Sequence, residues 1–184
     1  MSVITPAGHL GFQAPPFDLP GVDGRNHTLE SVRGGNGVLV MFICNHCPYV
    51  KAVLDKIVRD ARDLAAHDVG SIAIMSNDPT EYPEDSFDNM KAVAARHAFT
   101  FPYVIDLTQD IGRAYAAVCT PDFFGFNSRL ELAYRGRLDA SGRASDPNAT
   151  RELYDAMLEV ARTGKGPSEQ TPSVGCSIKW RRAS

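Results

Sequence analysis

Two continuous apolar runs dominate the first half of the chain. Val38–Ile43 follows a glycine-rich stretch, and Ser71–Ser76 has a similar mixture of β-branched and other apolar side chains. Short runs without polar alternation are typical of strands that are covered on both faces of a sheet. The pattern therefore predicts two central strands.

The residues that follow each run change to helical spacing. After the first run, apolar side chains recur every three or four positions as far as His67, and charged side chains fill much of the remainder. That spacing predicts an amphipathic helix, and a second helix is expected from about Asp85 to His97. Strands alternating with helices predict parallel pairing through right-handed crossovers. The apolar set of the first helix is Val50, Val53, Leu54, Ile57, Ala61, Leu64 and Ala65.

Shorter elements flank this unit. Before it, Phe12–Leu29 has extended pieces around Asp23-Gly24, a pair that favours positive φ, and predicts an N-terminal hairpin. The C-terminal tail over residues 164–184 is expected to dock through its apolar side chains. The other predicted elements are an extended segment at Phe101–Ile105, a short helix at Gln109–Ala117, an edge hairpin of Asp122–Phe126 and Leu130–Tyr134, and a last helix at Arg151–Arg162.

The composition indicates one globular domain over residues 1–184. A chain of 184 residues can bury a core of its own, and 43% hydrophobic with 22% charged residues excludes disordered and collagen-like chains. The formal net charge of −3 supplies no basic field that would gather a polyanion. Nucleic acid is therefore not an expected partner.

The sequence favours a cytoplasmic location, which changes how the cysteines are interpreted. No apolar run is long enough to span a bilayer, and the first residues lack the basic start and apolar stretch of a secretory signal, so no membrane contact is expected. In a reducing compartment, cysteines are more often catalytic, redox-sensing or metal-binding than structural. The four cysteines are Cys44, Cys47, Cys119 and Cys176.

The motif Cys44-Asn-His-Cys47-Pro stands where the first buried strand passes into the amphipathic helix. The helix N-terminus presents unpaired N–H groups and positive partial charge, which we expect to stabilise a thiolate on Cys44. Two intervening residues bring the sulfurs of Cys44 and Cys47 within bonding distance, so the pair can close and reopen a disulfide. Cys44 is the predicted nucleophile and Cys47 the predicted resolving thiol.

Other polar residues are expected to assist the pair. His46 can place positive charge near Cys44, which would stabilise the dithiol state and make the disulfide more oxidising. The loop after the second strand emerges at the same edge of the sheet, so Asp78, Glu81 and Asp85 are candidates for moving the proton of Cys47.

A family resemblance rests on the order of elements, the Cys-x-x-Cys pair, Thr120-Pro121 before an edge hairpin, and the segment Gly11–Leu19. In these features the chain resembles the redoxin branch of the thioredoxin-like proteins, which is the alkyl hydroperoxide reductase/thiol-specific antioxidant superfamily. The resemblance implies a thioredoxin-like α/β fold, a mixed sheet flanked by helices with an N-terminal hairpin extension. It also implies that Pro121 is a cis-proline facing the cysteines and that Thr120 offers its backbone to an incoming substrate. Asn45 and Phe123 are counted with Thr120 as substrate-binding residues.

These features predict a thiol-disulfide oxidoreductase. Cys44 attacks, a mixed disulfide forms and Cys47 resolves it, with no cofactor or metal required. The partners are protein or small-molecule disulfides and a thiol electron donor.

Two alternatives stay open. Members of the wider superfamily reduce hydroperoxides, and those of the peroxiredoxin class carry the motif Pro-x-x-x-Thr-x-x-Cys. If Cys44 is taken as the cysteine of that motif, Met41 stands at the Thr position and Gly37 at the Pro position. A zinc- or thiol-based sensor is the non-enzymatic alternative, because four cysteines can form a zinc site. Cys119 is interpreted as a buried apolar side chain rather than a third redox thiol, whereas Cys176 could either approach another thiol or pack inertly.

Overall fold

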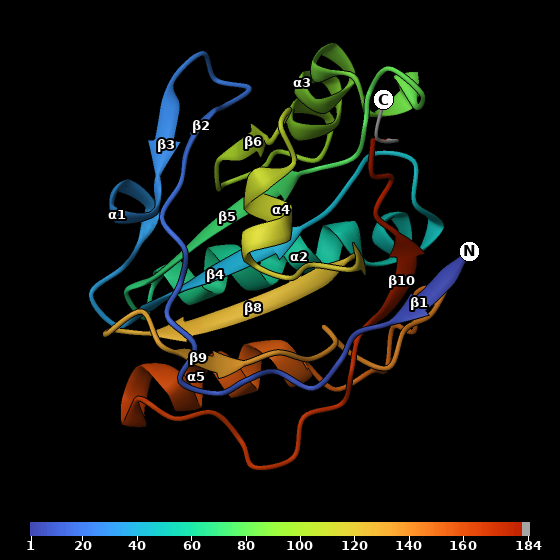
Figure 1. Ribbon diagram of the computed structural model, residues 1–184. Coiled ribbons are helices and arrows are strands. Elements are labelled where there is room, and N and C mark those ends of the chain that lie inside the picture. The colour runs from blue at the N-terminus through green and yellow to red at the C-terminus, as the bar shows by residue number, and fades with distance from the viewer. Residues whose placement is uncertain (182–184) are drawn as a thin grey trace.

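A mixed five-stranded sheet forms the centre of the computed structural model, which describes residues 1–181 (Figure 1). The spatial order is β6 (Tyr103–Ile105), β5 (Val69–Met75), β4 (Gly37–Phe42), β8 (Asp122–Asn127) and β9 (Leu132–Tyr134). Every residue of β4 and β8 is buried, as the continuous apolar runs predict for strands covered on both faces.

The strand directions agree with the predicted crossovers. Asn36 N–H donates to the Asp68 carbonyl at the start of β4 and β5, and Ile43 N–H donates to the Ile74 carbonyl at their ends. These two strands therefore run parallel, and β5 pairs parallel with β6. The predicted edge hairpin is present, with β8 antiparallel to both β4 and β9.

Helices cover both faces of the sheet. On one face, α2 (Pro48–Ala65), α3 (Phe87–Arg96) and α5 (Glu152–Thr163) pack against the side chains of alternate residues of β4. On the other face, α1 (Leu29–Val32) and the segment at the end of α4 (Asp110–Ala114) cover the residues in between. This division follows from the two-residue period of a strand. Leu39 and Met41 face the first core, and Val38, Val40 and Phe42 face the second.

Two helices differ in extent from the sequence prediction. The helix expected at residues 109–117 is confined to α4, because Gln109 and Ala116 both have left-handed backbone angles, with φ of 65° and 51°. The helix expected from Asp85 starts instead as a 3₁₀ turn, η1 (Pro83–Asp85), and α3 begins after Ser86. The Ser86 hydroxyl accepts the Asn89 N–H, which caps the new helix.

The predicted N-terminal hairpin is confirmed. Its strands β2 (Asp18–Pro20) and β3 (Asn26–Thr28) pair antiparallel, and Gly24 in the connecting turn has a φ of 80°. Only glycine adopts this left-handed conformation without steric cost, which is why the Asp-Gly pair is a useful turn signal.

A second small sheet brings the two ends of the chain together. It has the order β1 (Ser2–Ile4), β10 (Val174–Ser177) and β7 (Cys119–Thr120), all antiparallel. Figure 1 shows β1 and β10 side by side near the start of α2. The sequence did not predict β1, and the last three residues of the tail expected over 164–184 lie outside the described residues.

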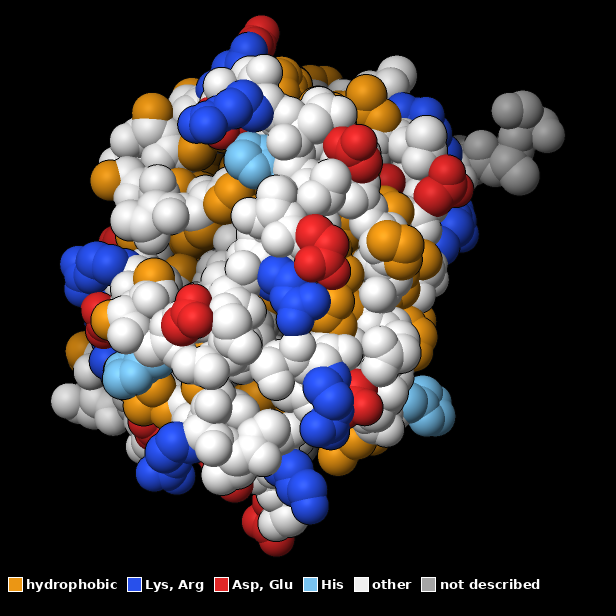
Figure 2. All heavy atoms as spheres, turned by 90° about the vertical axis from the view of Figure 1, so that its left-hand side faces the viewer, with side chains coloured by type: hydrophobic (Ala, Val, Ile, Leu, Met, Phe, Trp, Pro, Cys, Tyr) orange, Lys and Arg blue, Asp and Glu red, His pale blue; other side chains and the backbone are white. Residues whose placement is uncertain are grey.

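The surface carries both signs of charge. On the face in Figure 2, Lys and Arg side chains are interspersed with Asp and Glu, and apolar patches between them are small. Across residues 1–181, the helices fall short of the length and apolarity that crossing a bilayer requires.

Candidate active site

The Cys44–Cys47 segment lies where β4 passes into α2. Beyond the last residue of β4, Ile43 is still bonded to β5, and α2 begins at Pro48. Proline suits this first position because its missing N–H would have no helical partner. Cys47 is the residue that caps the helix, with extended backbone angles of −66° and 124°. The helix therefore starts directly after the second cysteine and not at the first.

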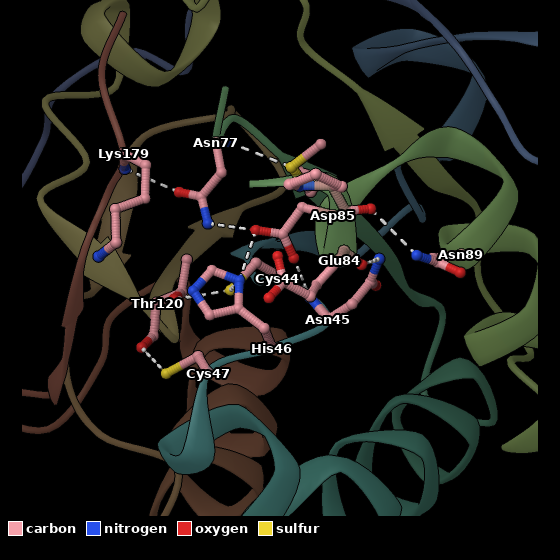
Figure 3. Close-up of polar contacts among 12 residues, drawn as sticks. Cys44, Asn45, His46, Cys47, Asn77, Glu84, Asp85, Asn89, Thr120 and Lys179 are labelled. Carbon is pink, nitrogen blue, oxygen red and sulfur yellow. Dashed lines mark hydrogen bonds and ion pairs between the residues drawn. The ribbon is translucent and has the colours of Figure 1, made fainter. Parts of the chain in front are cut away.

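Both sulfurs approach the Thr120–Pro121 peptide bond, which is cis as the resemblance implied. Cys44 Sγ lies 3.3 Å from Thr120 Oγ1, and the Cys47 thiol donates to the Thr120 carbonyl at 3.1 Å (Figure 3). The two cysteines are 2% and 0% exposed. Thr120 thus contacts both sulfurs, which are almost entirely buried.

Cys44 forms part of the wall of a groove between α2 and α3. The groove has a volume of about 460 Å³, within the range of small-molecule sites. Apolar side chains from both helices line its sides, and polar side chains stand around them. The lining residues are Cys44, Asn45, Val50, Lys51, Leu54, Glu84, Asn89, Ala92, Val93, Arg96 and His97.

A buried carboxylate anchors the residues between the cysteines. Asp85 is fully buried, and its oxygens accept the Asn45 N–H at 2.8 Å and the Asn77 side-chain amide at 2.7 Å, while its Oδ2 lies 2.7 Å from His46 Nδ1. His46 also stacks on Tyr82, with ring centroids 5.6 Å apart. Figure 3 shows His46 and Asp85 pointing toward each other beside Cys44.

The His46–Asp85 contact shifts both titrations. The hydrogen bond to Asp85 raises the pKa of His46 above its ordinary value. Burial by itself would raise the pKa of Asp85, but hydrogen bonds with His46 and Asn77 bring it below the ordinary carboxyl value. The pair is therefore an ion pair over a wider pH range than two isolated groups would be.

Asp85, one of the three candidate carboxylates, contacts the motif through Asn45 and His46. Asp78 instead accepts the Thr80 N–H at 3.0 Å and pairs with Arg181 at 3.4 Å, and Glu81 is exposed. The sequence could place all three at the correct edge of the sheet, but it could not predict the 3₁₀ turn that directs Asp85 inward.

The pKa of Cys47 is lowered and that of Cys44 is raised, whereas the argument from the helix N-terminus placed the thiolate on Cys44. A hydrogen bond from Cys44, with further contributions from the Val50 amide and from Cys176, lowers the pKa of Cys47 to about 4. The same hydrogen bond to Cys47 raises the pKa of Cys44, and burial and the negative charge of Asp85 add to this effect. The helix itself begins only after Cys47, so its first N–H groups lie nearer to Cys47 than to Cys44.

The other predicted site residues differ in how accessible they are to a substrate. The Thr120 backbone is not open to an incoming strand, since Cys176 of β10 is its register partner. Phe123 is buried on β8 and borders, with Pro121, a second cavity of about 310 Å³. Asn45 reaches the groove, but its side chain already accepts from Tyr103 at 3.0 Å and donates to the Glu84 carbonyl at 3.0 Å.

The remaining cysteines have different surroundings. Cys119 is fully buried, as predicted, and its thiol is directed to the Pro121 carbonyl at 3.6 Å, while burial strongly raises its pKa. Cys176 is partly exposed and lies on the side of the redox pair, because it is the register partner of Thr120, whose carbonyl accepts the Cys47 thiol. Burial raises the pKa of Cys176 to about 11.

The donor atoms of Cys44, His46 and Asp85 all lie within 4.8 Å of one another. A thiolate, an imidazole and a carboxylate are ligands that zinc accepts. This set differs from the four-cysteine zinc site considered from the sequence, because Cys119 is directed to Pro121.

Sequence reasoning missed Asn77, which connects the site to the tail. Its side chain donates to Asp85 and accepts the Lys179 N–H at 2.8 Å. Its position in the loop after β5 was the available signal, but an asparagine in a loop is too common to be singled out.

Comparison with protein families matches residues 10–137 to the AhpC/TSA family. No curated protein matches the chain. An uncharacterized conserved protein from Geobacillus kaustophilus is 45% identical, with a TM-score of 0.94 and coverage of 100% of this chain and 98% of that one. A hypothetical protein from Sinorhizobium meliloti is 32% identical, with a TM-score of 0.91 and coverage of 98% and 99%.

A more distant structure places the fold among thioredoxin-like proteins. A thiol:disulfide interchange protein of the thioredoxin family from Chlorobium tepidum is 16% identical, with a TM-score of 0.64 and coverage of 84% of this chain and 99% of that one. The thioredoxin-like α/β fold, with a mixed sheet flanked by helices, is thereby confirmed.

Proposed function

The chain belongs to the AhpC/TSA family, and we propose that it acts as a thiol-disulfide oxidoreductase that uses Cys44 and Cys47 as its redox pair. One observation carries the proposal. Both sulfurs contact Thr120 next to the cis-proline, with Cys44 Sγ 3.3 Å from its hydroxyl and the Cys47 thiol donating to its carbonyl at 3.1 Å. Two cysteines held against one residue in this way are suited to exchange with a disulfide.

The reaction starts with the pair as one thiol and one thiolate. Cys44 lines the groove, so its sulfur attacks the substrate disulfide and passes its proton to Cys47 along their hydrogen bond. The substrate S–S bond breaks, and the first substrate sulfur leaves as a thiolate. Cys47 then attacks Cys44 Sγ and its proton goes to the second departing sulfur, which leaves a Cys44–Cys47 disulfide. A thiol donor reverses these steps and restores the pair.

Insulin reduction in the presence of dithiothreitol tests this proposal. We expect Cys44→Ser to lose the activity and Cys47→Ser to accumulate a mixed disulfide on Cys44. Cys119→Ser is the matched control, because its thiol is buried away from the pair. Native rates in both Cys44→Ser and Cys47→Ser would overturn the assignment.

Hydroperoxide reduction is a second candidate, favoured by the match of residues 10–137 to the AhpC/TSA family. In that reaction Cys44, which lines the groove, passes its proton to Cys47 and attacks the peroxide oxygen, and an alkoxide leaves. Cys47 then condenses with the sulfenic acid to release water and form the same disulfide. Peroxide consumption with dithiothreitol decides between the two. A rate equal to that without the protein removes this candidate.

A further inference from the structure

The strand β10 holds a third thiol against the redox pair. Cys176 stands opposite Thr120, the residue whose carbonyl accepts the Cys47 thiol. The neighbouring Gly175 packs so tightly that a Cβ built on it would lie 2.1 Å from the Thr120 oxygen. The strand β1 pairs with the other edge of β10, so the position of Cys176 is fixed from both sides.

Cys47 therefore has two cysteines near it and not one. Cys44 lies three residues before it, and Cys176 stands on β10 opposite Thr120, whose carbonyl accepts the Cys47 thiol. Cys119 is close in sequence to Thr120, but it pairs with Ser177 and its thiol is directed to Pro121. The contact with Cys176 thus follows from the strand register and is not a general crowding of cysteines.

We propose that Cys176 is a third redox cysteine, which takes over the disulfide of Cys47 after the Cys44–Cys47 bond has formed. This step rests on the function proposed above. The Cys176 sulfur attacks Cys47 Sγ, the Cys44–Cys47 bond breaks, and the Cys47–Cys176 bond forms. The proton that Cys176 gives up ends on Cys44, so the exchange needs no further oxidant or reductant.

The exchange changes which sulfur faces the electron donor. Cys44 and Cys47 are buried, whereas Cys176 is partly exposed. A donor thiol that cannot reach the Cys44–Cys47 disulfide can attack Cys176 in the Cys47–Cys176 disulfide. Cys47 is then the leaving group, and it is a better leaving group than Cys176 because its pKa is lower. Cys44 is meanwhile returned to its thiol form at the groove.

Oxidation of the Cys44→Ser variant with glutathione disulfide tests the relay. Glutathione first forms a mixed disulfide with the partly exposed Cys176, and Cys47 then displaces it. We expect an intramolecular Cys47–Cys176 disulfide by peptide mapping after alkylation, with loss of alkylation at both cysteines. Cys119→Ser in the same background is the control, since its disulfide pattern should not change. A glutathione adduct that persists on Cys176, with no Cys47–Cys176 disulfide, would overturn the relay.

The same oxidation of the wild-type protein distinguishes a failure of the relay from a failure of the proposed function. If it forms Cys44–Cys47 while Cys44→Ser forms no Cys47–Cys176 bond, the relay alone is wrong. If neither bond forms in the wild type, both the relay and the proposed function are wrong. Any disulfide that includes Cys119 reports unfolding, because this thiol is fully buried in the native chain, and circular dichroism of each variant shows whether it has folded.

Discussion

The assignment of the thiolate to Cys47 can be tested by removing the hydrogen bond that contributes most to it. The Cys44 thiol is the largest cause of the lowered pKa of Cys47, which lies at about 4. A hydrogen bond to a charged group contributes about 1.5–3 kcal/mol, and one pKa unit corresponds to about 1.4 kcal/mol. Cys44→Ala should therefore raise the pKa of Cys47 by about 1–2 units. Cys44→Ser keeps a hydroxyl donor and should raise it less.

Thiolate absorbance near 240 nm, followed against pH in the reduced protein, measures this shift. The other thiols do not interfere below neutral pH, because burial raises the pKa of Cys176 to about 11 and that of Cys119 further. Cys47→Ser should remove the acidic transition altogether. The reasoning fails if the transition survives in Cys47→Ser and disappears in both Cys44 variants, since the thiolate would then belong to Cys44.

Three further predictions concern stability and access. Asp85→Asn should lower the free energy of unfolding in urea by about 1.5–3 kcal/mol, because it removes a charge-assisted hydrogen bond to the partly exposed His46. The loss should be largest between pH 3.8 and pH 6.5, the ordinary pKa values of the two groups, since the contribution of Asp85 disappears as pH falls through its lowered pKa and that of His46 as pH rises through its raised pKa. Arg135→Leu should cost about 3–5 kcal/mol in urea, because it leaves the buried Asp122 without its partner at 2.9 Å, and adding Asp122→Asn should recover part of the loss. Equal stability of these Arg135 variants and the native protein would refute this. Gly175→Val should displace β10 from Thr120 and speed the alkylation of Cys47. Gly142→Val is the control, because a Cβ at residue 142 has nothing within 4 Å, and it should leave the alkylation rate unchanged. Equal alkylation rates in the two variants would contradict the role of β10 in covering Cys47.

Periodicity was sufficient for the elements that the core determines. Uninterrupted apolar runs predicted β4 and β5, and the 3.6-residue spacing predicted α2, because burial on two faces or one face dictates those patterns. The short strand β1 carries no such pattern, since only Val3 of its three residues is even partly buried. Its pairing with β10 depends on backbone hydrogen bonds, to which any sequence without proline can contribute.

The sequence predicted which residues would lie together but not the contacts among them. The Cys-x-x-Cys spacing placed the two sulfurs together, and the family resemblance implied the cis peptide bond that the structure has at Pro121. The difference in pKa between the two sulfurs depends chiefly on the contact of Cys44 with Cys47 and on where α2 begins, and helix ends are hard to place from sequence to within two residues. The contact between Cys176 and Cys47 depends on the register of β10, about 130 residues further along the chain than the pair, which no local pattern reveals.

A redox titration of the Cys176→Ser protein in dithiothreitol buffers tests the central claim most directly. Alkylation of the reduced thiols followed by mass spectrometry reports which cysteines pair at each potential. The proposed function predicts one reversible two-electron couple that joins Cys44 to Cys47, with Cys119 reduced throughout. A pair that stays reduced at every potential, or that is protected from alkylation until a chelator is added, would contradict it and would indicate a metal site built on Cys44, His46 and Asp85.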